Sequence, residues 1–347
     1  MLSEPTLPHA VPVPAFLEAR YGRSSAGRGW LSSLPGLLAD LVERWHLDVD
    51  LAPGGQPWHG HGAIVVPVRQ DDGSPAALKI AFPHDEALVE RHALALWEGR
   101  GAVALLASDP GTCAMLLERL DAGRSLAGLA MDDAVPVWGG LVRQLGLAPD
   151  HRPGWQEFEH IAARAEQWSD ELPAEWEQLG RPFPRWLLEA ALEVCQTRVA
   201  VGRRSAHDVL VHTDLHFLNV LARPGLPPVG EAPTAAGYAA IDPQPMIGEP
   251  EFAVAPLLWN RLADLPASLA GAALLRRCHD FSSAAGLDGD VARQWAIARE
   301  VENALGYAAQ GHRGDLARSL WVSSTLAGKT LDGLPDPHSL PEPGQDG

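Results

Sequence analysis

The sequence is poor in cysteine and has no long apolar run. Its three cysteines, Cys113, Cys195 and Cys278, are widely spaced and form no CxxC pair. This pattern argues against a disulfide framework and a structural zinc site, and it favours a reducing, cytoplasmic location. No stretch of about 18 apolar residues is present, so we expect no membrane-spanning helix. The N-terminal MLSEPTLPHAVPVPAF lacks a basic start followed by an apolar segment, so we expect no secretory signal.

Basic residues are also scarce. The chain has 27 Lys and Arg against 44 Asp and Glu, for a net charge of −17. We expect such a chain to repel nucleic acid and anionic membranes, so neither is the expected partner. The imbalance is concentrated after residue 120, where 18 basic residues face 30 acidic ones. Two interpretations remain open here: the acidity attracts a cationic small molecule, or it merely keeps the protein soluble.

Lysine is the rarest basic residue. Lys79 and Lys329 are the two lysines beside 25 arginines. Lys329 is expected on the surface near the C-terminal end. Lys79 lies inside the apolar segment Ala76–Phe82, where a compact ammonium needs an anionic partner. The sequence therefore singles out Lys79 as a candidate functional residue.

The first 120 residues predict a small sheet-containing lobe. Apolar spacing predicts a helix over 34–45, and a turn at 71–75 predicts a hairpin between Ala63–Val68 and Ala76–Phe82. Another helix is expected over 84–99, followed by strands at Val103–Leu106 and Cys113–Leu117. Residues 1–25 are rich in Pro and then in Arg, Ser and Gly, and we expect them to be loosely held.

After Leu120 the pattern becomes mainly helical, which predicts a second lobe over 121–333. Long amphipathic stretches are expected to be helices at 133–148, 154–170 and 184–203. A short strand is expected at Val209–His212, and a hairpin-like pair of strands is expected at Asn219–Ala222 and Tyr238–Ile241. Residues 334–347 are polar, and we expect a disordered tail. The fold class is therefore α+β, with a small β-rich lobe before a larger helical one.

The segment from Val211 to Leu221 carries the strongest chemical signal. His212-Thr213-Asp214 is followed by Asn219, and this His-x-Asp with Asn five residues later is the spacing of the kinase catalytic loop. An aspartate can face an incoming hydroxyl while the asparagine, across a tight turn, reaches a metal on the phosphates. Asp242 ends an apolar strand 23 residues beyond Asn219 and is placed for a second metal ligand. The combination is much rarer than His-x-Asp alone.

The chain resembles the aminoglycoside phosphotransferase superfamily, within it the streptomycin and hydroxyurea phosphotransferase branch. That branch has the pattern Ile-Asp-Pro-x-Pro-x-x-Gly-(Asp/Glu)-Pro, which reads here as Ile241 to Pro250, and an Asn-Arg pair, which reads as Asn260-Arg261. Leu78-Lys79-Ile80, Gly99–Val103 and Leu116–Leu120 also match. The resemblance implies a bilobal, protein-kinase-like fold with ATP and Mg²⁺ as cofactors.

The resemblance implies a role for each loop residue. Asp214 would position and deprotonate the acceptor hydroxyl, while Asn219 and Asp242 would hold magnesium. The implied activity is ATP-dependent phosphoryl transfer to a hydroxyl of a small molecule. Asp214 is thus the candidate catalytic residue.

The resemblance also implies the nucleotide contacts. Lys79 would bind the α- and β-phosphates of ATP, steadied by a helix carboxylate. Glu90 matches the family at this position, and Glu86, one helical turn earlier, is the alternative. Glu118 and Leu120 follow the last strand of the first lobe, where backbone groups would pair with the adenine edge.

The acceptor is expected to be cationic and polyhydroxylated, such as a streptomycin-like aminoglycoside. Glu249 and Glu251 lie just beyond Asp242 in sequence, and Asn260 and Arg261 follow shortly after. These four residues are the candidate acceptor contacts. The alternative for the two glutamates is that they are solvated residues at a helix start, favoured by the helix dipole.

One departure from the family pattern motivates an alternative function. After Pro250 the family has an aromatic residue and then an aspartate that braces the catalytic loop, but here Glu251-Phe252-Ala253 follows. Ala253 takes the expected aspartate position. A nucleotide-binding pseudokinase is therefore one alternative, and a sugar or metabolite kinase of the same fold is another.

Overall fold

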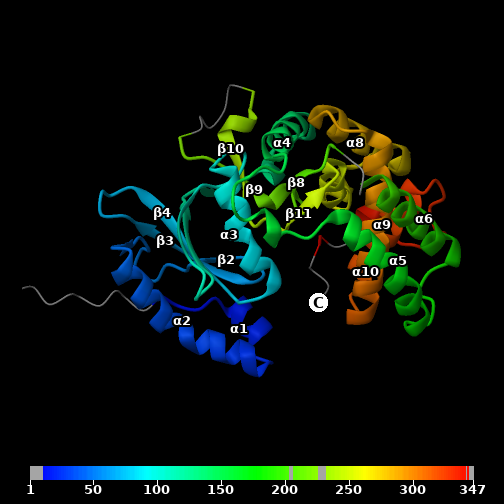
Figure 1. Ribbon diagram of the computed structural model, residues 1–347. Coiled ribbons are helices and arrows are strands. Elements are labelled where there is room, and N and C mark those ends of the chain that lie inside the picture. Colours follow the sequence, from blue (N-terminus) through cyan, green and yellow to red (C-terminus); the bar gives the residue numbers. More distant parts are fainter. Residues whose placement is uncertain (1–10, 203–205, 226–231, 341, 344–347) are drawn as a thin grey trace, which may run out of the picture. The chain divides into compact units, whose positions relative to one another are not determined.

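The computed structural model describes residues 11–202, 206–225, 232–340 and 342–343 (Figure 1). The chain divides into two units. One comprises the residues up to Gly99 together with Val103–Leu120, and the other comprises Arg100–Ala102 and the residues from Asp121 onward. The first contains a large sheet and the second is mainly helical, as expected. Among the described residues, none of the helices combines the length and apolar character that crossing a bilayer requires.

The first unit is organised around an antiparallel sheet with the order β1-β3-β4-β6-β5, in which β2 also pairs with β3. Its strands are β1 (Asp48–Val49), β2 (Trp58–His59), β3 (Ala63–Arg69), β4 (Pro75–Ala81), β5 (Leu105–Asp109) and β6 (Ala114–Glu118). The predicted hairpin is confirmed, because β3 pairs with β4 in register from Ala63 opposite Ala81 to Arg69 opposite Pro75. Strand β4 is central, with β6 on its other side.

The two faces of β4 serve different purposes. Leu78 and Ile80 are fully buried in an apolar cluster that includes Trp30 and Leu34 of α2 (Ser25–Arg44). Since successive strand residues point to opposite faces, Lys79 projects from the other face. Helix α3 (Asp85–Trp97) supplies its partner there, as described below.

The N-terminal segment is better ordered than the sequence predicted. Helix α1 (Ala15–Tyr21) lies with α2 below the strands in Figure 1, and Leu17 is fully buried in the same apolar cluster. The expectation of a loosely held segment over 1–25 is therefore wrong for residues 15–25, whereas residues 1–10 lie outside the described residues. Ser24 caps α2 by accepting a hydrogen bond from the Gly27 N–H, so the predicted helix begins earlier than expected.

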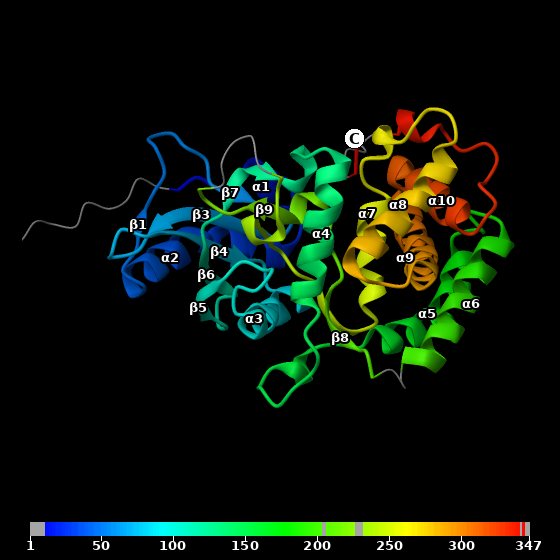
Figure 2. The ribbon, with the colours of Figure 1, turned by 90° about the horizontal axis from the view of Figure 1, so that it is seen from above.

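The second unit is built around α9 (Gly289–Gln310), which packs against α6, α8 and α10 (Figure 2). The other helices are α4 (Met131–Leu145), α5 (Ile161–Gln178), α6 (Arg185–Gly202), α7 (Ala255–Leu258), α8 (Ala270–Ala285) and α10 (Arg313–Leu326). Helices α5 and α6 pack on each other, as do α4 and α8. This helical framework supports two small sheets.

The two small sheets hold the segments that carry the predicted motifs. Strand β8 (Val209–His212) pairs antiparallel with β11 (Pro245–Gly248). Strand β9 (Val220–Ala222) pairs with β10 (Tyr238–Ala240) on one side and β7 (Asp121–Ser125) on the other. The expected β9–β10 pair is confirmed, whereas β7 and β11 had no counterpart in the prediction.

Part of the expected C-terminal tail is ordered. Residues Pro337–Ser339 form a short 3-10 turn, in which Pro337 is buried and His338 Nε2 lies 2.6 Å from the carbonyl oxygen of Leu265. The prediction of disorder is therefore wrong for residues 334–340. Residues 341 and 344–347 lie outside the described residues.

Candidate active site

The loop that follows β8 is held by the ring of His212. This buried ring uses both nitrogens: Nδ1 accepts a hydrogen bond from the Asp214 N–H at 3.2 Å, and Nε2 donates to the Ile241 carbonyl at 2.9 Å. The assigned tautomer therefore carries its proton on Nε2. Burial lowers the pKa of His212 to about 4. The ring is thus a neutral brace between the loop and the end of β10, rather than a proton carrier.

Asp214 and Asn219 lie together across the turn. The Asn219 amide nitrogen donates to the Asp214 carbonyl at 2.9 Å and lies 3.2 Å from Asp214 Oδ2. The Asp214 side chain is 27 % exposed, so a substrate can reach it. The side-chain nitrogen of Asn219 donates hydrogen bonds to Asp214, so the side-chain oxygen of Asn219 is the atom that can coordinate a cation.

Asp242 is brought next to Asn219 by the backbone. The Ile241 N–H donates to the Asn219 carbonyl at 2.9 Å, and Asp242 follows in the left-handed conformation with φ of 51°. Aspartate tolerates this conformation better than most residues. The sequence-predicted pair Asn219 and Asp242 is thus brought together by a direct hydrogen bond between their segments.

The oxygen donors at this place fit magnesium. Mg²⁺ takes oxygen ligands and is held in proteins by one or two carboxylates together with substrate phosphates. Asp242 offers a carboxylate and Asn219 an amide oxygen. Within the part of the chain that the structure describes, no group of three or more His, Cys, Asp and Glu side chains could hold a metal ion by itself. A magnesium ion held by Asp242 and Asn219 would have further coordination positions open to water or to substrate phosphates.

In the sheet unit, Lys79 and Glu90 form a buried ion pair. Lys79 Nζ lies 2.7 Å from each carboxylate oxygen of Glu90, and the two side chains are only 7 % and 6 % exposed. The predicted anionic partner of Lys79 is therefore present, and it is Glu90. The side chain of Glu86, the alternative, lies outside the described residues.

Glu118 makes its contacts within the sheet unit. Its N–H donates to the Ala104 carbonyl at 2.9 Å, and its carboxylate accepts from the Ala104 N–H at 3.2 Å. Leu120 is buried at the end of this segment. The adenine contacts implied for Glu118 and Leu120 stay predictions, and the N–H of Glu118 is already used by Ala104.

The position of Glu249 corrects its expected role. Its side chain is 9 % exposed, Oε1 lies 3.2 Å from Arg198 Nη1, and Oε2 accepts from the Trp295 indole at 2.8 Å. Burial raises the pKa of this carboxyl, and the indole and guanidinium oppose that rise. Glu249 therefore ties α6 to α9, and this use of both oxygens argues against a contact with the acceptor. Glu251 is partly exposed and accepts from the Asp288 N–H at 3.2 Å.

The Asn260-Arg261 pair also makes internal contacts. Asn260 is buried and donates to the Pro256 carbonyl at 2.8 Å. Arg261 donates to the Leu129 carbonyl at 3.0 Å and pairs with Asp264. The Arg261 guanidinium also lies 5.0 Å from the ring centroid of Phe217 in the candidate catalytic loop, residues 213–219 after β8. The burial of Asn260 argues against its expected contact with the acceptor, whereas Arg261 borders the loop.

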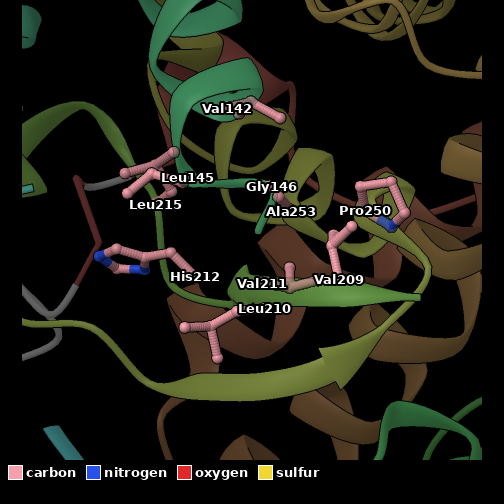
Figure 3. Close-up of a pocket in the computed structure, with 10 residues that line it drawn as sticks. All are labelled: Val142, Leu145, Gly146, Val209, Leu210, Val211, His212, Leu215, Pro250 and Ala253. Atoms are coloured by element: carbon pink, nitrogen blue, oxygen red, sulfur yellow. The ribbon is translucent and has the colours of Figure 1, made fainter. Parts of the chain in front are cut away.

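Ala253 lines a small apolar pocket beside the candidate catalytic loop (Figure 3). The pocket is lined by Val142, Leu145, Gly146, Val209, Leu210, Val211, His212, Leu215, Pro250 and Ala253. Ala253 is buried, and the walls carry no acid. The loop is therefore held without a carboxylate at this position.

Sequence reasoning missed one contact of the loop. Arg299 of α9 donates through Nη1 to the Thr213 carbonyl, and its Nη2 lies 3.5 Å from Asp214 Oδ1. No motif marks this arginine, which is one of 25 and lies 86 residues from Thr213. The tertiary packing of α9 is what brings Arg299 to the loop.

Comparison with known proteins finds extensive similarity. A model of the aminoglycoside/hydroxyurea antibiotic resistance kinase family matches residues 44–311. The chain is 35 % identical to a streptomycin 6-kinase of Streptomyces glaucescens, over 85 % of this chain and 90 % of that protein. It is 36 % identical to a hydroxyurea phosphotransferase of Kitasatospora aureofaciens, over 92 % and 87 %.

A solved structure supports the fold. An aminoglycoside phosphotransferase, APH(4)-Ia, solved as a thermostable mutant in its apo form, matches with a TM-score of 0.54. The alignment covers 83 % of this chain and 96 % of the other, at 17 % sequence identity. The expected kinase-like architecture is therefore confirmed at the level of the fold.

Proposed function

This chain belongs to the aminoglycoside/hydroxyurea antibiotic resistance kinase family, and we propose that it transfers the γ-phosphoryl group of ATP to a hydroxyl of a cationic, aminoglycoside-like molecule. The observation that carries the proposal is the arrangement of Asp214, Asn219 and Asp242. The side-chain amide of Asn219 faces Asp214. The Asn219 carbonyl accepts a hydrogen bond from the N–H of Ile241, the residue before Asp242. These groups match the needs of phosphoryl transfer, which depends on alignment and charge stabilisation.

In this proposal Asp214 accepts the proton of the acceptor hydroxyl. Its carboxylate is accessible, and its backbone is fixed by His212 and Asn219 on either side. A base held in this way orients the hydroxyl toward the phosphorus atom. Positioned proton transfer contributes roughly 10²–10⁴ in rate.

Asn219 and Asp242 would hold Mg²⁺ through their side-chain oxygens. Bound magnesium would neutralise charge on the nucleotide phosphates. In the sheet unit, the ammonium of Lys79 would contact the α- and β-phosphates, with Glu90 keeping its side chain in place. The ion pair is buried, so the ammonium has little freedom to leave this position.

Two observations support a cationic acceptor: the acidic excess of residues 121–347 and the similarity of this chain to streptomycin 6-kinases. Residues 121–347 carry 30 acidic and 18 basic side chains, and this excess attracts a cation at low ionic strength. Two streptomycin 6-kinases, from Streptomyces glaucescens and Streptomyces griseus, are 35 % and 34 % identical to this chain. Glu251, which is partly exposed, remains the candidate acceptor contact among the two glutamates.

The proposal is tested by measuring ATP consumption with streptomycin, other aminoglycosides, amino sugars and neutral hexoses, and by mass spectrometry of each product. We expect a cationic aminoglycoside to gain one phosphoryl group, at a rate that falls as salt is added. D214N should lose most of this transfer while retaining ATP binding. D280N, at an exposed position of α8, is the matched control and should react like the wild type. Phosphorylation of neutral sugars alone, insensitive to salt, would support a sugar kinase instead.

Hydroxyurea is a second candidate acceptor, because the hydroxyurea phosphotransferase matches 92 % of this chain. The same assay distinguishes the two candidates. A phosphorylated hydroxyurea product with no transfer to streptomycin would replace the cationic acceptor and keep the phosphotransferase. ATP binding without transfer to any acceptor would favour the pseudokinase alternative.

A further inference from the structure

We infer that Arg299 is a positioning residue that holds the catalytic loop of this chain. The inference rests on the proposed function in one respect, namely that Asp214 is the base. Arg299 belongs to α9, the central helix of the second unit, and contacts both Thr213 and Asp214. It therefore connects the loop directly to the most extensively packed helix of that unit.

Thr213 is held by three hydrogen bonds from two directions. Its N–H and hydroxyl both donate to the Gln244 carbonyl, at 3.1 and 2.7 Å, and its own carbonyl accepts from Arg299 Nη1. Gln244 immediately precedes β11, whereas Arg299 comes from α9. The peptide that leads into Asp214 is thus clamped between a strand and a helix. Without Arg299, only the Gln244 side of this clamp would remain.

The two oxygens of the Asp214 carboxylate have different neighbours. Oδ1 lies 3.5 Å from Arg299 Nη2, whereas Oδ2 lies 3.2 Å from the Asn219 amide nitrogen and 3.6 Å from His216 Nε2. Contacts on both oxygens restrict rotation of the carboxylate plane. A guanidinium suits this role, because its planar fork can address the Thr213 carbonyl and the carboxylate at once.

Arg299 is itself held in place. Its side chain is 15 % exposed, and its guanidinium carbon lies 5.5 Å from the ring centroid of Phe252. Phe252 is buried between Trp168 and Trp295, with ring centroids 6.2 and 5.3 Å away. A cation stacked on a fixed aromatic ring loses little further freedom when it bonds to the loop.

The surroundings of Ala253 agree with this role. The Arg299 guanidinium stacks on the ring of Phe252, and the next residue, Ala253, lines the pocket beside the loop, whose lining residues include no acid (Figure 3). The loop thus lacks a carboxylate brace from position 253. Instead, the loop is held by the hydrogen bonds of the His212 ring to Asp214 and Ile241 and by the hydrogen bond from Arg299 of α9 to Thr213.

Hydrogen exchange tests the inference without any acceptor. In R299M the amide hydrogens of the peptide covering residues 210–219 should exchange faster than in the wild type. The matched control is R293M, because Arg293 lies on the same helix and also donates to a backbone carbonyl, that of Leu326 at 2.9 Å. R293M should leave exchange at 210–219 unchanged. Unchanged exchange in R299M would overturn the inference.

Kinetics separate positioning from a general loss of structure. R299M should lower kcat by about 10²-fold while the KM of the acceptor and the affinity for Mg·ATP stay unchanged, because misplacement of a reacting group costs rate rather than binding. R299K should fall between R299M and the wild type. Methylguanidinium added to R299A should restore part of kcat, and it should not restore D214N.

Each contrary result is distinct. If R299M lowers kcat, Mg·ATP affinity and unfolding temperature together, and methylguanidinium does not restore the kcat of R299A, then Arg299 is merely structural. If the wild type phosphorylates no acceptor, the proposed function fails. The exchange measurement still decides whether Arg299 holds the loop.

Discussion

The buried ion pair between Lys79 and Glu90 gives a prediction in which stability and activity separate. Replacing either partner alone leaves the other charge buried without its counter-ion. Each of K79M and E90L should therefore lower the free energy of unfolding by about 3–5 kcal/mol, which is the range for breaking a buried pair. An exposed pair would contribute at most about 1 kcal/mol. The 2.7 Å distances and the low exposure place Lys79 and Glu90 in the buried class.

The double variant K79M/E90L should be much more stable than either single variant. It removes both charges, and apolar side chains of similar volume often replace a buried pair at no net cost. Urea unfolding followed by circular dichroism, on all four proteins, measures the coupling free energy between the two sites. Single variants that lose less than about 1 kcal/mol would show that the pair behaves as if solvated. A double variant whose loss equals the sum of the two would show that the sites are independent.

Nucleotide binding completes this test. If Lys79 contacts phosphates, calorimetry should show that all three variants lose Mg·ATP affinity, including the double variant that folds well. A double variant that is both stable and binds Mg·ATP like the wild type would refute the role of Lys79, while leaving the stability argument intact.

Three further predictions concern the helical unit. D242N should weaken Mg·ATP binding in calorimetry with little change in the urea midpoint, because the proposed function makes the partly exposed Asp242 a magnesium ligand; equal affinities would contradict this proposed role. A253D should lower the free energy of unfolding by about 3 kcal/mol or more in urea titrations, because it buries a carboxylate in an apolar pocket without a counter-ion, and an unchanged midpoint would mean that the new acid finds a partner. Burial raises the pKa of Glu300 from 4.5 to about 7, so the folded state holds a proton that the unfolded state has released. Stability from this group is therefore lost as the pH rises from about 4.5 to about 7, and E300Q should gain about 3 kcal/mol relative to the wild type across that range. If the free energies of unfolding of the wild type and E300Q change in parallel with pH, the raised pKa of Glu300 is contradicted.

Local patterns explain which parts of the fold the sequence could predict. The hairpin of β3 and β4 combines two apolar segments with a turn of Asp, Gly, Ser and Pro, and both signals are contained in the 19 residues from Ala63 to Ala81. Strand β7 reads Asp-Ala-Gly-Arg-Ser and has no apolar alternation. It is a strand because β9 lies beside it. Such pairing is decided by tertiary structure, which a local pattern does not contain.

The candidate site divides in the same way. Asp214 and Asn219 are five residues apart and Lys79 and Glu90 eleven, so a turn or a strand-to-helix connection brings each pair together. Arg299 acts on a carbonyl 86 residues away, and no spacing rule links the two. The predictable part of the site is therefore the part with short sequence separations.

Glu249 shows why a motif does not assign a role to each of its residues. Its place in the Ile241–Pro250 motif, close to Asp242, suggested a carboxylate that meets a cationic acceptor. Sequence proximity to Asp242 says nothing about which way the side chain points after β11 has paired with β8. The side chain points inward to Arg198 and Trp295, which are 51 and 46 residues away in opposite directions along the chain. Its negative charge is therefore used to join α6 and α9. Because α9 also carries Arg299, this buried contact helps to fix the helix that holds the catalytic loop.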